Sequence, residues 1–176
     1  NSNITYFYLE QKNALTSDNR NNFKANNTYG VNTSKGIELG VDWKPDGKKY
    51  GVDFDYTYTK SFDSNNCNSG GCHRKSSELG EAKVRVPRNA FSSNITHNTF
   101  PGLTNSVQIK FVDERRDFGN GNNSFKDVIL EDYTTINLRS NYRLYDTYDL
   151  FFDAKNIFDD NYEQAHEYSS MGRSFN

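Results

Sequence analysis

The chain has 176 residues, a formal net charge of -2, and 15% aromatic residues. Its mean hydropathy of -0.94 is that of a polar chain, but a disordered chain lacks this many aromatic side chains. No apolar run is long enough for a membrane helix, which excludes a helical membrane protein. The Lys and Arg residues are scattered and form no basic stripe, which argues against a nucleic-acid partner. Because the chain opens without a signal peptide, we interpret it as a fragment of a mature exported protein.

Period-two alternation predicts a series of β-strands along the chain, with no helical period competing with them. In residues 50–62, aromatic residues and valine occupy one face from Tyr50 to Tyr58, and Gly, Asp and Thr occupy the other. This alternation requires an apolar surface on one side and water on the other. The expected strands are 3–12, 35–44, 50–62, 82–97, 105–117, 131–144 and 147–157, with a further strand beginning near Arg173.

The predicted strand 82–97 breaks its own alternation. Val86 lies at an even position, whereas Phe91 and Ile95 carry the apolar pattern at odd positions. A residue must therefore be absorbed between the two halves. Pro87 cannot donate to a strand ladder, so we expect a β-bulge at this proline.

The connections between the strands alternate in length. Transmembrane β-barrels show this alternation, because their periplasmic turns are short and their outer loops are long. The long connections, rich in Asn, Ser, Asp and Gly, are 10–34, 62–81, 117–130 and 158–172. The short connections are 45–49, 98–104 and 144–147.

The end of the chain carries two specific motifs in a fixed order. The first is Asn156-Ile157-Phe158-Asp159-Asp160-Asn161-Tyr162, and the second is Gly172-Arg173-Ser174-Phe175. Together they resemble the C-terminal end of a TonB-dependent outer-membrane receptor, where an Asn-Leu-Phe-Asp-x-x-Tyr motif closes the penultimate strand and Gly-Arg-Ser/Thr-Phe starts the last. Ile157 replaces the usual Leu of that family. Arg85-Val86-Pro87-Arg88 is similar to the family's start of a descending strand.

This resemblance implies an all-β fold. Residues 1–176 would form the C-terminal segment of an antiparallel transmembrane β-barrel of about 22 strands, with long outer loops and short periplasmic turns. The plug domain of such receptors is not in this chain. The implied location is the bacterial outer membrane, and the implied partners are outer-membrane lipid, a small-molecule ligand, and TonB acting through the absent plug region.

The resemblance implies TonB-coupled, energy-dependent uptake of a scarce nutrient, either cobalamin or a ferric siderophore. The ending with Tyr162-Glu163-Gln164 is similar to that of vitamin B12 receptors. Two other classes fit the strand pattern: a secreted β-sandwich that binds glycans, and a small self-contained barrel with an enzymatic or adhesive role. The number and arrangement of strands separate these classes.

Loops on a rigid scaffold are where a receptor meets its ligand. The candidate ligand contacts are Tyr29, Phe118, Phe125, His166, Tyr168 and Met171, each of which could also pack against another loop. Residues 156–162 have two interpretations: they could contact the ligand at the outer mouth, or they could terminate the strand. We favour termination, with Asn and Asp satisfying their own backbone and with Phe158 and Tyr162 anchored at the membrane interface.

Cys67 and Cys72 are the only cysteines, and four residues with two glycines separate them. A disulfide suits an exported protein and this spacing. A metal site with His73 is the competing interpretation, but it offers too few ligands and lacks a second Cys-x-x-Cys motif. We therefore expect a disulfide, no metal and no cofactor.

No catalytic motif is present. The histidines His73, His97 and His166 are far apart in sequence and lie in no metalloprotease pattern, and there is no nucleophile elbow or P-loop. Paired acids such as Asp53 and Asp55 are explained by the wet face of a strand or by turns. The sequence therefore predicts a protein that is not an enzyme.

Overall fold

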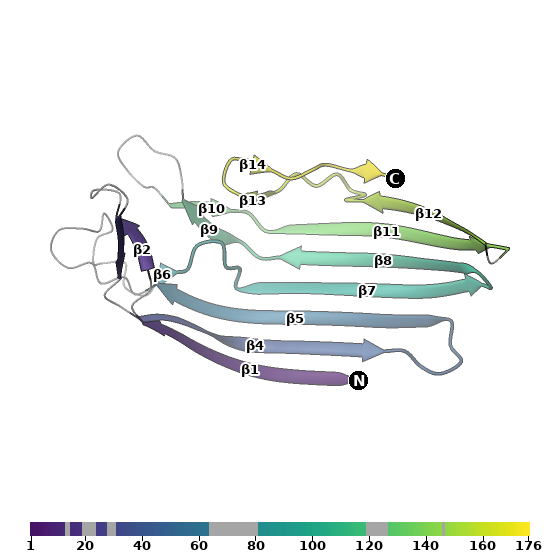
Figure 1. The fold of residues 1–176 in the computed structure, drawn as a ribbon, viewed down its shortest axis with the longest axis horizontal. Coiled ribbons are helices and arrows are strands. Elements are labelled where there is room, and N and C mark those ends of the chain that lie inside the picture. The colour runs from purple at the N-terminus through teal and green to yellow at the C-terminus, as the bar shows by residue number, and fades with distance from the viewer. Residues whose placement is uncertain (13–14, 19–23, 28–30, 64–80, 119–126, 146) are drawn as a thin grey trace.

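The computed structural model describes residues 1–176 except 13–14, 19–23, 28–30, 64–80, 119–126 and 146. The main element is a nine-stranded sheet in the order β1-β4-β5-β7-β8-β11-β12-β15, with β6 also paired to β5 (Figure 1). Its strands are β1 (Ser2–Lys12), β4 (Val31–Trp43), β5 (Tyr50–Asp63), β6 (Glu81–Ala82), β7 (Asn89–Phe100), β8 (Leu103–Val112), β11 (Tyr133–Leu144), β12 (Tyr148–Lys155) and β15 (Ser174–Phe175).

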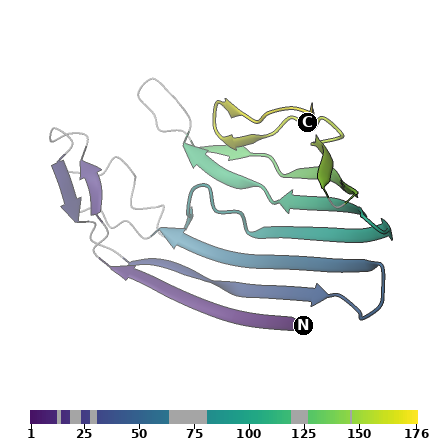
Figure 2. The same ribbon diagram turned by 45° about the vertical axis from the view of Figure 1, so that its right-hand side comes forward.

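The sheet is a single layer of antiparallel strands, as the turned view in Figure 2 also shows. Among the described residues the other sheets are three two-stranded hairpins, and none of them forms a second extended layer, so the β-sandwich alternative is wrong: a sandwich needs two packed layers. Buried apolar residues are correspondingly few in the described part, namely Val112, Leu130, Tyr133 and Ala154. None of the described residues forms a helix long and apolar enough to span a membrane.

Short turns gather at one end of the sheet, which we call the turn end, and the strand ends that the long connections join lie at the other, the loop end (Figure 1). Gly47 has φ +67° in the β4–β5 turn and Gly102 has φ +87° between β7 and β8, a region that glycine enters at no steric cost. Tyr145 adopts φ +53° in the β11–β12 turn. The expected sorting of short turns and long loops onto opposite ends is confirmed.

Cross-strand register separates the side chains into an apolar face and a polar face, because directly opposed residues share a face. Val52 lies opposite Trp43 and Ile95, and Phe54 lies opposite Val41 and Ser93. The expected two faces of strand 50–62 are therefore confirmed. Aromatic rings continue across the apolar face, where Phe91 and Phe111 stack with centroids 5.3 Å apart.

The predicted strand 82–97 is instead two strands, β6 and β7, separated by residues 83–88. Ala82 pairs with Phe62, and Asn89 pairs with Tyr58. Between these pairs β5 advances four residues while the opposite chain advances seven, so three residues are extra. An odd number of extra residues shifts the apolar positions from even to odd, which explains the break in alternation. The expected bulge of a single residue at Pro87 was wrong, because three residues are inserted.

Three of the long connections contain short hairpins that the sequence did not predict. They are β2 (Leu15–Asp18) with β3 (Lys24–Asn27), β9 (Arg115–Phe118) with β10 (Asp127–Leu130), and β13 (Glu163–Ala165) with β14 (Tyr168–Ser169). The predicted strand 105–117 therefore ends at Val112, and its remainder enters β9. Polar strands such as Lys24–Asn27 lack alternation with apolar residues, so periodicity gave no signal for them.

Candidate functional site: a charged cluster at the loop end

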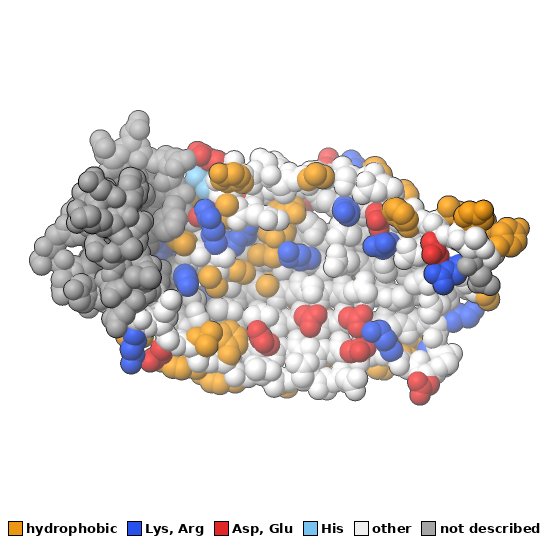
Figure 3. Space-filling model, in the orientation of Figure 1, with side chains coloured by type: hydrophobic (Ala, Val, Ile, Leu, Met, Phe, Trp, Pro, Cys, Tyr) orange, Lys and Arg blue, Asp and Glu red, His pale blue; other side chains and the backbone are white. Residues whose placement is uncertain are grey.

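The polar face of the sheet carries most of the charged side chains of its strands. Acidic residues belong mainly to β4 and β5, where Asp42 lies opposite Asp53, and basic residues belong mainly to β8 and β11. Figure 3 shows charged side chains of both signs over this face. The polar-face charges are Glu38, Asp42, Asp53, Asp55, Lys110, Arg139, Arg143, Asp149, Asp153 and Lys155.

Ion pairs join neighbouring strands near the turn end. Lys44, just beyond β4, lies 3.1 Å from Asp53 Oδ1 and 3.4 Å from Asp42 Oδ1. Hydrogen bonds to Asp53 and then Asp42 raise the pKa of Lys44 above its ordinary value. Arg143 donates two hydrogen bonds to Asp149, at 2.8 and 3.1 Å. These exposed pairs fix local geometry and contribute little to stability.

Asp117 on β9 is the centre of a cluster at the loop end, and its side chain is 0% exposed. Arg85 Nε donates to Asp117 Oδ1 at 2.8 Å, and the backbone N–H of His166 donates to Oδ2 at 2.7 Å. The Arg85 backbone N–H also donates to the Arg116 carbonyl at 2.7 Å. One carboxylate thus holds together three segments that are distant in sequence. A buried carboxylate needs such charge-assisted partners to remain ionised.

Arg115 extends this cluster toward β11. Its Nη2 donates to the Glu163 carbonyl, and its guanidinium lies 5.3 Å from the centroid of the Tyr133 ring. Tyr133 stacks on Tyr162 with centroids 3.9 Å apart. Segment 156–172 therefore folds back over the polar face. Tyr162, which we expected at the membrane interface, packs on this side instead because the Tyr133 ring offers it a buried partner.

Residues of the first motif terminate β12. Asn156, with φ +50° and only 5% exposed, closes a local ring: its Nδ2 donates to the Asp160 carbonyl at 2.9 Å and its Oδ1 accepts from the Asp160 N–H at 3.0 Å. Its backbone N–H donates to Asn137 Oδ1 at 2.9 Å. Asp159 Oδ1 accepts the Arg173 N–H at 2.7 Å, which joins the two motifs. This geometry is that of strand termination.

The predicted ligand contacts are spread unevenly. His166 lies in the cluster, with its Nδ1 3.6 Å from Glu163 Oε2, whereas Tyr168 and Met171 are 73% and 80% exposed. Phe118 is the last residue of β9. Tyr29, Phe125, Cys67, Cys72 and His73 lie outside the described residues, so the contacts and the disulfide remain predictions. No cluster of metal-binding side chains occurs in the described part of the chain.

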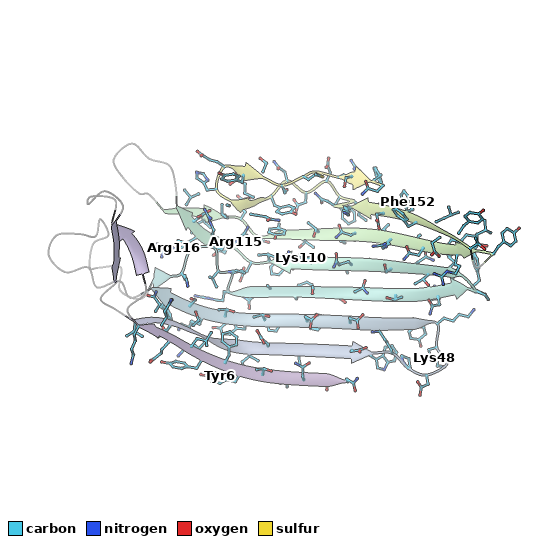
Figure 4. All side chains as sticks on the ribbon, viewed as in Figure 1. Tyr6, Lys48, Lys110, Arg115, Arg116 and Phe152 are labelled. Carbon is cyan, nitrogen blue, oxygen red and sulfur yellow. The ribbon has the colours of Figure 1, made fainter. Side chains whose placement is uncertain are left out.

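Sequence reasoning missed the residues that hold the cluster together. Asp117 and Arg115 lie in no recognisable local motif, and the stretch that begins at Arg85 gave no indication of the partner of that arginine. The partners of these three residues are 32 to 49 residues away. The only signal was the run Arg115-Arg116-Asp117 at the expected end of a strand, which a loop would also show. Figure 4 shows Arg115 and Arg116 near the loop end of the sheet and Lys110 further along β8.

Comparison with known proteins places this geometry in a family. The family model described as "TonB dependent receptor-like, beta-barrel" matches residues 1–157. No curated protein matches. The chain therefore belongs to the TonB-dependent receptor β-barrel family, a family of outer-membrane receptors and not of enzymes. The expected all-β membrane-barrel class and the outer-membrane location are confirmed.

Solved structures share the fold at low sequence identity. The siderophore receptor PiuA from Acinetobacter baumannii aligns with a TM-score of 0.77 and 24% identity, over 99% of this chain and 25% of that one. The FrpB iron transporter from Neisseria meningitidis gives 0.76 and 15%, over 99% and 27%. The ferric-catecholate import receptor Fiu from E. coli gives 0.73 and 15%, over 99% and 24%. The chain thus spans about a quarter of the length of these structures.

Family membership gives the two faces and two ends their meaning. The apolar face contacts lipid, and the polar face lines the interior of the barrel. The turn end is periplasmic and the loop end is outside. The cluster centred on Asp117 therefore lies at the outer mouth, on the interior side, where segment 156–172 folds inward.

Proposed function

We propose that this chain is part of an outer-membrane receptor that takes up a ferric siderophore by TonB-coupled transport. The observation that carries the proposal is the family match over residues 1–157. Three similar solved structures are those of a siderophore receptor, an iron transporter and a ferric-catecholate import receptor. None of these three is a cobalamin receptor by name, so we place cobalamin second, although the end of this chain resembles that of vitamin B12 receptors.

The interior side of the mouth offers cationic groups to an anionic chelate. Lys110 points to the polar face opposite Ser92 and Thr135, is exposed, and has no ion-pair partner among the described residues. Arg115 Nη1 has no hydrogen-bond partner in the described part of the structure although the side chain is 6% exposed. Cations in a channel wall concentrate anions by long-range attraction. This favours ferric chelates with negative charge over neutral ligands.

The energy source and the ligand can be tested together in the complete receptor. Cells expressing it should accumulate a radiolabelled ferric catecholate, and a protonophore should abolish accumulation. Labelled cobalamin, tested in parallel, should accumulate less. Uptake that survives the protonophore would indicate a passive pore, and uptake of cobalamin alone would reverse the choice of ligand.

The contribution of Lys110 to ligand binding at the mouth can be tested by comparing substitutions of two lysines. Lys110→Gln should weaken binding of an anionic ferric catecholate by about fivefold, since one nearby charge contributes about 1 kcal/mol. Lys48→Gln, in the periplasmic turn, removes the same charge far from the mouth and should leave binding unchanged (Figure 4). Equal effects of the two substitutions would contradict a local role for Lys110.

A further inference from the structure

Two lysines face each other on the lipid side of the barrel. Lys35 on β4 lies directly opposite Lys60 on β5, in the same register row as Tyr8 on β1. Both lysines are exposed, and within the described residues neither has an acidic partner. Lys60 Nζ lies 5.2 Å above the Phe62 ring, which leaves its charge unneutralised. Like charges directly opposed across strands destabilise a sheet, so an external anion would relieve this pair.

The lysine pair lies at the outer interface of the membrane. Trp43 and Tyr50, with ring centroids 5.5 Å apart, form the aromatic interface at the periplasmic end. Lys35 is eight residues from Trp43 along β4, about 27 Å at a rise of about 3.4 Å per residue. A strand tilt of about 35–45° converts this to about 20 Å along the membrane normal. Since the apolar band is about 25 Å tall, Lys35 lies close to its outer edge.

The surroundings of the pair suit a lipid head group. On the same face, one register row nearer the periplasmic end, lies Tyr6, which is 67% exposed and labelled in Figure 4. Ile37, directly opposite Tyr6 on β4, is 45% exposed. The nearest acid on β1 is Glu10, which accepts a hydrogen bond from Tyr8 at 2.6 Å and lies 3.8 Å from Lys12. Beside Lys60 the strand ladder opens, because residues 84–87 lie outside it, between the Lys83–Ser61 and Thr59–Arg88 backbone hydrogen bonds.

We propose that Lys35 and Lys60 bind the phosphate of an outer-leaflet lipid of the lipid A type, whose acyl chains lie along Tyr6 and Ile37. A compact ammonium is a common phosphate ligand, and two of them match a group with two negative charges. The exposed aromatic and aliphatic side chains just below supply the apolar surface that acyl chains need. This lipid site is separate from the mouth and does not depend on which nutrient the receptor transports.

The test uses the complete receptor in detergent with added bisphosphorylated lipid A, and native mass spectrometry measures the bound lipid. The double variant Lys35→Gln/Lys60→Gln should bind this lipid at least about tenfold more weakly, since each lysine near an anionic lipid surface contributes measurably to binding. Lys35→Arg/Lys60→Arg should keep most of the binding. Lys48→Gln controls for the loss of positive charge elsewhere.

A second measurement distinguishes head-group binding from a folding defect. Without lipid A, the double glutamine variant should melt at the same temperature as the wild type or higher, because it loses a like-charge repulsion. With lipid A, only the wild type should gain stability. Three results would each overturn the proposal. The double glutamine variant could bind lipid A as tightly as the wild type, or Lys48→Gln could weaken binding as much as the double variant does. The wild type could also bind dephosphorylated lipid A as tightly as the bisphosphorylated form.

Discussion

Arginine at position 39 tests which face of the sheet meets lipid. Leu39 lies on the apolar face of β4, opposite Ile4 and Tyr56, and midway between Trp43 and Lys35. Four residues from Trp43 correspond to about 10 Å along the membrane normal, near the middle of an apolar band about 25 Å tall. Leu39→Arg should therefore lower the free energy of unfolding by about 2–4 kcal/mol, the cost of a cation at the bilayer midplane.

The control is Thr57→Arg on the polar face of the neighbouring strand. Thr57 lies opposite Glu38, and an opposite-charge pair across strands contributes about 0.2–1 kcal/mol. We therefore expect this variant to stay within about 1 kcal/mol of the wild type.

Urea titration of the complete receptor in lipid vesicles would measure both variants. The Leu39→Arg cost corresponds to about 30- to 1,000-fold in the folding equilibrium, well beyond the error of such titrations. Equal costs for the two variants would refute the assignment of the faces, because both positions would then lie in the same environment.

Three further predictions concern the loop end, the cysteines and the turn end. Asp117→Asn should raise the rate of amide hydrogen exchange in residues 158–172 by about 5- to 150-fold, because a buried hydrogen-bonding partner is lost. The melting temperature of the barrel should not change. An unaltered exchange rate would contradict the role of Asp117. Alkylation without reductant, read by mass spectrometry, should leave Cys67 and Cys72 unmodified, and two alkylated thiols would exclude the disulfide. Because the pKa of Lys44 is raised, the stabilising effect of its ion pairs should be complete below the ordinary lysine value and disappear as pH rises through the raised pKa. The difference in melting temperature from Lys44→Met should thus vanish only at strongly alkaline pH, and a difference that vanishes at neutral pH would contradict this.

The sequence predicted the wall of the barrel well because the wall follows a local rule. Lipid on one face and water on the other force alternation on every strand, as from Tyr50 to Tyr58, and this alternation can be read within ten residues. Short turns are equally local, since Pro45 and Gly47 supply the required backbone angles within a single turn. Outside residues 82–88 and 113–117, the positions of the wall strands therefore followed directly from the pattern, as did the sorting of the loops.

The mouth could not be predicted in the same way because it depends on contacts between distant segments. Nothing near Asp117 in sequence indicates that Arg85 and the backbone of His166 will bind the two oxygens of its carboxylate. The three extra residues between β6 and β7 show the same limit: parity revealed that an odd number had been inserted, but only pairing with Phe62 and Tyr58 shows how many.

The wall and the mouth are held together by different forces, and this separates stability from specificity. Backbone hydrogen bonds between neighbouring strands hold the wall and tolerate many side chains on its two faces. Buried side-chain bonds to Asp117, together with the stacking of Tyr133 on Tyr162, hold segment 156–172 over the mouth. Substitutions in this segment can therefore reshape the surface that meets a ligand while every ladder bond of the wall remains. Since the hydrogen bond that His166 donates to Asp117 comes from its backbone N–H, a substitution of the side chain at position 166 leaves this donor in place.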